Sequence, residues 1–200
     1  MRRVGAALVA ILIVSSPILA QRGVLTRPCD LDHLVERSAL IVRGHVVSAR
    51  VERHPEFAHL ATVVVKLRLL EILKGQPGPD ADFTFRQYIW DVRDHYDAAG
   101  YRKGQELLLL MNPSTRYGLS SPAGLDQGRF RITRDAQGNR LAVNGHGNAG
   151  LFHNLEPQLI RKHIGLSSHL SAMIRSQTGG PISLSDLEDL IRSLVTENAR

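Results

Sequence analysis

The stretch "ATVVVKLRLLEILKG", from Ala61 to Gly75, decides between a helical and a β fold. Its leucines, glutamate and lysines suit a helix, but its apolar residues recur at every second position. They are Ala61, Val63, Val65, Leu67 and Leu69. Period two predicts a half-buried strand, whereas an amphipathic helix needs a stripe at a spacing of about 3.6 residues. We therefore expect "LRLLEILKG" to be the end of a strand followed by a turn, because the turn residues "KGQPG" come next.

The segments on either side carry further strand signals. "LIVRGHVVSARVERH", from Leu40, is rich in β-branched residues and changes phase near Gly44, which predicts a bulge or a sharp bend. "DFTFRQYIW", from Asp82, predicts a third strand, and "ELLLLM", from Glu106, predicts a central one because it is apolar on both faces. "RFRITRDAQGNRLAV", from Arg129, predicts a hairpin around a turn that contains glycine.

Helical signals flank the strands. "DLDHLVERSA" predicts a short helix, which Asp30 or Asp32 would cap. Residues 155–176 predict helical turns that are interrupted near Gly165.

The last segment predicts an amphipathic C-terminal helix. It opens with a capping box, Ser185 at the N-cap and Glu188 three residues later. The apolar stripe that follows consists of Leu187, Leu190, Ile191, Leu194 and Val195. The expected fold is mainly β: a small closed antiparallel barrel of five to six strands, with a short N-terminal helix and this C-terminal helix.

The first twenty residues have the pattern of a signal peptide. Arg2 and Arg3 form a positive head, the uncharged run "VGAALVAILIVSS" follows, and a small residue, Ala20, precedes Gln21. We expect cleavage between Ala20 and Gln21; the alternative is an uncleaved N-terminal anchor. The expected division is a signal peptide (1–20), a flexible lead-in (21–29), a barrel (30–154) and a helical extension (155–200). No later apolar run is long enough to span a membrane.

Charge and export limit the class of partner. Of the 25 basic side chains, Arg2 and Arg3 lie in the leader, and the remaining 23 against 19 acidic ones leave a net charge of +4. That balance is mild for a dedicated DNA-binding protein. Export to the periplasm or the extracellular space also speaks against genomic nucleic acid. We expect a protein or envelope partner and no cofactor.

The chain has a single cysteine, Cys29, so it can form no internal disulfide. "TRPCD" lacks the small apolar residues of a lipoprotein anchor site. Cys29 is then either a reactive or metal-binding thiol or a small residue partly covered by the first helix. A single exported thiol also permits an intermolecular disulfide.

Four segments together carry a family resemblance: "LVERSALIVRGHVVS", "LEILKG", "GQELLLLM" and "GRFRI" with its following "GN". From Asp30 to Val143 the chain resembles a group of exported bacterial proteins whose fold is similar to the netrin-like module of tissue inhibitors of metalloproteinases. The resemblance implies an OB-like five-stranded barrel. In those inhibitors the mature N-terminal cysteine binds the protease zinc and a C-x-C pair forms disulfides. Here Cys29 would be the ninth mature residue and has no second cysteine beside it, so protease inhibition does not transfer.

Histidines and basic side chains provide the candidate ligand groups. None of the nine histidines lies in a recognisable zinc motif, but His95, His146 and His153 are candidates to converge on a metal. Arg86, Tyr88 and Trp90 share the outward phase of one strand. With Arg129 and Arg131 they could form a basic, aromatic strand face for an anionic polymer, or they could simply protect strand edges with charge.

Catalytic motifs are not recognisable in the sequence. Asp91, Asp94, His95 and Asp97 crowd one loop, but such clusters are usually solvated, and no nucleophile elbow occurs. We expect an exported, non-enzymatic binding or interaction module. The alternative is an envelope protein that binds a metal or an anionic polymer through surface histidines or the arginine face.

Overall fold

The computed structural model describes residues 28–198, which form one seven-stranded antiparallel sheet and five α-helices. The strands are β1 (Leu40–Arg53), β2 (Ala61–Lys74), β3 (Asp82–Tyr88), β4 (Glu106–Met111), β5 (Arg129–Arg134), β6 (Arg140–Asn144) and β7 (Ile182–Ser183). The helices are α1 (Leu31–Arg37), α2 (Val92–Asp97), α3 (Leu155–Arg161), α4 (Ser168–Ser176) and α5 (Leu184–Asn198). The predicted signal peptide and its cleavage site lie outside the described residues.

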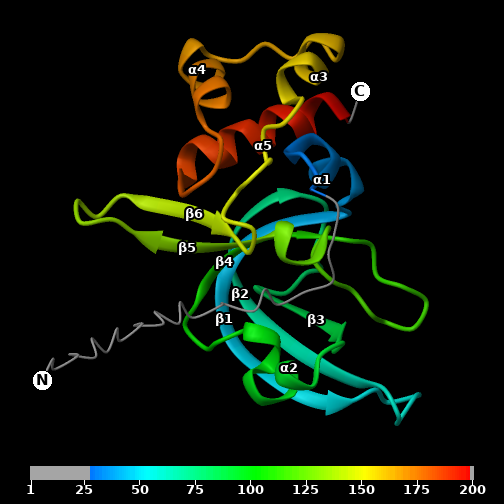
Figure 1. Cartoon of the computed structure of the whole chain (residues 1–200). Coiled ribbons are helices and arrows are strands. Elements are labelled where there is room, and N and C mark those ends of the chain that lie inside the picture. Colours follow the sequence, from blue (N-terminus) through cyan, green and yellow to red (C-terminus); the bar gives the residue numbers. More distant parts are fainter. Residues whose placement is uncertain (1–27, 199–200) are drawn as a thin grey trace, which may run out of the picture.

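The opening stretch is a strand, as its alternation predicts. β2 runs to Lys74 and pairs along most of its length with β1, and Gly75 turns the chain at a φ of 78°. The pairing shifts register between Arg43 and Gly44, which confirms the predicted irregularity. A side chain at Gly44 would place its Cβ 2.5 Å from the carbonyl oxygen of Arg68, so only glycine fits this close approach. Both long strands bend across the molecule (Figure 1).

The sheet is open, so the prediction of a closed barrel of five to six strands is wrong. The strand order is β3-β2-β1-β4-β5-β6-β7, and the two edge strands do not pair with each other. β4 pairs with β5 through Leu107 to Leu109, which carries the sheet on toward β6 and β7. Irregular chain approaches both β3 and β4 instead of a strand: Leu119 makes a single bridge to Arg86, and Pro122 makes one to Met111.

Two apolar cores lie on opposite faces of this sheet. Alternate leucines of β4 contribute to each core, with Leu108 and Leu110 on one side and Leu107 and Leu109 on the other. This confirms the prediction of a central strand that is buried on both faces. The first core lies under α1, α3, α4 and α5, which gather on one side in Figure 1. The second core fills the concave side formed by β1 to β4, together with Tyr101.

The C-terminal helix forms as predicted but begins earlier. α5 starts at Leu184, so Ser185 lies inside the helix and is not its N-cap. The Ser183 hydroxyl accepts a hydrogen bond from the Asp186 N–H at 3.5 Å. Glu188, the expected capping partner, is instead buried and paired with Arg43. The sequence does not decide whether the apolar stripe covers the sheet or faces a partner; in the structure it packs into the first core.

Three of the remaining helices, α1, α3 and α4, agree with their signals, whereas α2 forms where a polar loop was expected. Asp30 caps α1 by accepting from the His33 N–H, and α3 and α4 are separated around Gly165. After α4 the chain returns to the sheet, where Ile182 of β7 pairs with Ala142 of β6. Within residues 28–198, no helix combines the length and apolar character needed to cross a membrane.

Candidate functional site

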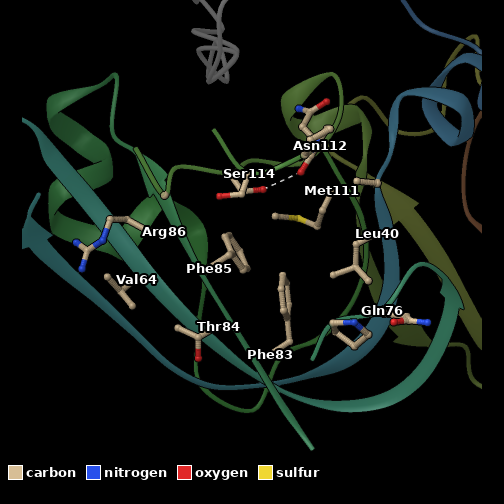
Figure 2. Close-up of a pocket in the computed structure, with 15 residues that line it drawn as sticks. Leu40, Val64, Gln76, Phe83, Thr84, Phe85, Arg86, Met111, Asn112 and Ser114 are labelled. Atoms are coloured by element: carbon tan, nitrogen blue, oxygen red, sulfur yellow. Dashed lines mark hydrogen bonds between the residues drawn. The ribbon is translucent and has the colours of Figure 1, made fainter. Parts of the chain in front are cut away.

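A pocket of about 430 Å³ lies between β3 and the chain that follows β4 (Figure 2). Its apolar lining consists of Ala39, Leu40, Val64, Pro77, Phe83, Phe85, Met111 and Pro113. Its polar lining consists of Gln76, Thr84, Arg86, Asn112, Ser114 and Ser120, and Gly118 completes it. The volume is in the lower part of the range typical of small-molecule and side-chain pockets.

Strand register brings the floor of the pocket together. Leu40 and Met111 are direct partners across β1 and β4, so they lie at the same end of the sheet. Phe83 and Phe85 share one face of β3, and their ring centroids are 5.7 Å apart. Phe85 and Met111 also belong to the second core, so the pocket opens directly onto packed apolar side chains. In Figure 2 both phenylalanines and Met111 surround the cavity.

Hydrogen bonds within the chain fix the opposite wall, residues 112–120. The Thr115 N–H donates to the Leu119 carbonyl at 2.8 Å, which closes a tight turn. The Ser120 N–H donates to the Arg86 carbonyl at 2.8 Å, and the Ser120 hydroxyl donates to the Asn112 carbonyl at 2.9 Å. The wall is therefore tied to both β3 and the end of β4, and the pocket is preformed.

Among residues 28–198, no lining side chain places a free charge inside the pocket. Arg86 is the single charged residue among those that line it. Its guanidinium donates to the Thr62 hydroxyl at 2.7 Å, lies 3.4 Å from a Glu52 carboxylate oxygen, and points away from the cavity in Figure 2. At the start of β3, Asp82 pairs with Lys66 at 2.9 Å, and the hydrogen bond from Lys66 lowers the pKa of Asp82. An uncharged apolar group therefore suits this pocket better than an ion.

The predicted basic and aromatic face is divided between distant strands. Arg86, Tyr88 and Trp90 belong to β3 and the residues just after it, where the rings of Tyr88 and Trp90 meet edge to face at 4.8 Å. Trp90 is 71 % exposed. Arg129 and Arg131 belong to β5, and three strands, β2, β1 and β4, separate β5 from β3.

Arg129 was expected to face outward from its strand. Its guanidinium instead makes contacts within the protein. Its guanidinium stacks 4.8 Å above the Tyr101 ring and donates to an Asp126 carboxylate oxygen at 2.6 Å. It also donates to the Ala99 carbonyl at 2.7 Å, next to a turn in which Ala98 and Ala99 have positive φ. Burial raises the pKa of the Tyr101 hydroxyl to about 12. Arg129 thus holds this turn against the second core.

The three candidate histidines lie on separate segments. His95 is exposed on α2, His146 is exposed in the loop after β6, and His153 is exposed just before α3. Residues 28–198 contain no group of three or more histidine, cysteine or carboxylate side chains that could hold a metal ion. The structure therefore does not bring these histidines together as a zinc site.

Cys29 lies just before α1. Its side chain is half-buried and packs against the core beneath the helices, and its N–H donates to the Gln127 side-chain carbonyl at 2.7 Å. This environment fits the second of the two interpretations of Cys29, a small residue partly covered at the start of the first helix.

Sequence reasoning found part of the pocket and missed the rest. The alternation in "DFTFRQY" placed Phe83 and Phe85 on one face. Leu40, Met111 and the wall at residues 112–120 join them only through pairing between distant segments, for which the sequence has no local signal. Comparison of the chain with family models, with curated proteins and with solved structures found no match.

Proposed function

We propose that the mature chain is an exported, non-enzymatic binding module that holds an uncharged apolar group in the pocket between β3 and residues 112–120. The observation that carries this proposal is the composition of the pocket. Leu40, Phe83, Phe85 and Met111 form an apolar floor, while hydroxyl and amide groups line the rim. Apolar walls with a few placed polar groups are typical of ligand sites.

Two further observations support the parts of this proposal that concern export and the type of fold. The charged head and apolar run of residues 1–20 support export. The bridges of Leu119 to Arg86 and of Pro122 to Met111 place irregular chain against both β3 and β4. That arrangement supports a relation to the OB-like, netrin-like module, since OB folds are partly open barrels. The alternative, binding of metal or anionic polymer, has weaker support because its candidate residues lie on separate segments.

Binding of a neutral apolar dye, N-phenyl-1-naphthylamine, tests the pocket. Ser114 is exposed at the rim, so Ser114→Trp fills the pocket without changing a core residue. Ser168, exposed at the start of α4, provides a matched control in Ser168→Trp. We expect the dye to bind the original chain and the control equally, and to bind Ser114→Trp at least tenfold more weakly. Equal dye binding by all three proteins would show that the pocket is not the site.

A further inference from the structure

The edge of β3 presents backbone groups that the sheet does not use. At the two ends of the β2–β3 ladder, the Ile89 N–H donates to the Ala61 carbonyl and the Leu69 N–H donates to the Ala81 carbonyl. In an antiparallel ladder the bonded residues alternate, so Phe83 and Phe85 point their backbone groups toward β2. Thr84 and Arg86 then point theirs to the opposite, outer edge.

The chain itself already uses one position on this edge. The Arg86 carbonyl accepts from the Ser120 N–H, and Leu119 pairs with Arg86 in the parallel sense. Beyond this point the wall turns away, because Gly118 and Leu119 are bonded back to Thr115. No residue in the described range 28–198 bonds the Thr84 N–H or carbonyl on the outer edge.

The pocket lies beside this unused position. It is lined by Phe83 and Phe85 from one face of β3 and by Thr84 and Arg86 from the other, so it surrounds the strand edge itself. We infer that an extended, uncharged peptide segment of a partner protein adds to the edge of β3 at Thr84 and places an apolar side chain in the pocket. This inference rests on the proposed function of the pocket.

The recognition chemistry follows from the two parts of the site. Backbone hydrogen bonds to an exposed strand edge provide affinity for any extended peptide, and a pocket for alternate side chains provides selectivity. The apolar floor selects an aliphatic or aromatic side chain. Because the Arg86 guanidinium is engaged, the described part of the chain offers no charge in the cavity to pair with a carboxylate or an ammonium group.

Displacement of the bound dye by members of a peptide library tests the inference. Uncharged heptapeptides that alternate apolar residues with serine or threonine are screened for displacement of N-phenyl-1-naphthylamine from the full chain. We expect a subset with a large central apolar residue to displace it. If the dye binds and Ser114→Trp abolishes its binding, yet no peptide displaces it, strand addition is wrong while the pocket stands. If Ser114→Trp leaves dye binding intact, the proposed function itself fails.

N-methylation of a displacing peptide then tests whether its backbone amides donate hydrogen bonds to the edge of β3. Methylating one amide removes one donor and keeps every side chain. Because backbone groups alternate in direction along a strand, we expect methylation of the amide that donates to the Thr84 carbonyl to weaken displacement at least tenfold. Methylation of the amides on either side of it should have little effect. Uniform tolerance of methylation would overturn the inference.

Hydrogen exchange measured by NMR locates the added strand on the protein. We expect a saturating peptide to slow exchange of the Thr84 amide at least tenfold, while the ladder-bonded amides of Phe83 and Phe85 change little. Thr84→Pro removes the edge donor and should abolish peptide binding, whereas Thr84→Val keeps the backbone and should retain it. An unchanged Thr84 amide would refute the placement. Concentration-dependent protection of Thr84 in the chain alone would assign the edge to a second copy instead.

Discussion

A buried ion network between α5 and the sheet provides the sharpest test of how the helix is held. Arg43 on β1 donates to a Glu188 carboxylate oxygen of α5 at 2.6 Å and to a Glu106 carboxylate oxygen of β4 at 2.9 Å. The side chains of Arg43 and Glu188 are only 11 % and 10 % exposed. We predict that Glu188→Gln destabilises the fold because Arg43 remains buried after losing one of its two carboxylate partners.

The size of this effect follows from burial and from the partner that remains. Breaking a buried ion pair by removing one member costs about 3–5 kcal/mol. Arg43 keeps Glu106, and glutamine preserves the shape and a hydrogen-bond acceptor, so we expect the lower end, about 3 kcal/mol. For a chain of this length each kcal/mol lowers Tm by about 2–4 °C, which predicts a fall of about 6–12 °C.

Urea denaturation followed by circular dichroism measures the free energy of unfolding. The matched control is Glu156→Gln, because Glu156 pairs with Arg175 at 3.1 Å while both side chains are about half exposed. Exposed pairs contribute about 0–1 kcal/mol, so the control should be nearly silent. The double variant Arg43→Met, Glu188→Leu should recover much of the lost stability, since apolar side chains can replace a buried pair. A loss for Glu188→Gln no larger than that for the control would refute the reasoning.

Three further predictions concern the strands, the cores and the response to alkali. Gly44→Ala should destabilise the chain by about 1–3 kcal/mol through contact with the Arg68 carbonyl, whereas Gly165→Ala, with open space around its Cβ, should be neutral or slightly stabilising; thermal melts compare the two. Leu190→Ala, at a fully buried position of α5, should cost about 2–5 kcal/mol, while Ile160→Ala, 69 % exposed, should change the free energy of unfolding by less than about 0.5 kcal/mol in urea. Burial raises the pKa of Tyr101 to about 12, above the ordinary tyrosine value of about 10. The stability that its neutral ring provides is therefore complete below about pH 10 and is lost as the pH rises through about 12. Tyr101→Phe should flatten the fall of Tm over that pH range, and an unchanged pH profile would contradict the assignment.

Strands β1 to β6 were predictable from the sequence because their signals are local, whereas the two-residue strand β7 was not predicted. The two-residue alternation from Ala61 to Leu69 reports which side of a strand is buried, and the phase change at Gly44 reports the irregularity. Closure of the sheet is not a local property. It depends on which edge groups meet after folding, and here the chain after β4 reaches β3 through a bridge at Leu119 and returns to β4 through a bridge at Pro122. A pattern that fits a closed barrel therefore fits this open sheet equally well.

Glu188 and Arg43 show the same limit for polar residues. Arg43 follows three apolar residues of β1, and no sequence signal assigns it a partner. Glu188, three residues after Ser185, was interpreted as a member of a capping box. α5 lies over the face of the sheet that carries Arg43. Arg43 and Glu188 therefore pair at 2.6 Å, and both side chains are shielded from solvent.

The candidate pocket shows the same limit of sequence patterns for apolar residues. Phe83 and Phe85 could be placed on one face from their spacing, but spacing cannot show that the outer edge of β3 is covered at Arg86 and left open at Thr84. That difference arises because the turn at Thr115 directs the wall away from the strand one step past Leu119. Shortening or straightening that turn would extend the chain's own pairing along β3 toward Thr84. The geometry of one turn therefore determines whether the chain's own residues cover the edge of β3 at Thr84 or leave it open to a partner.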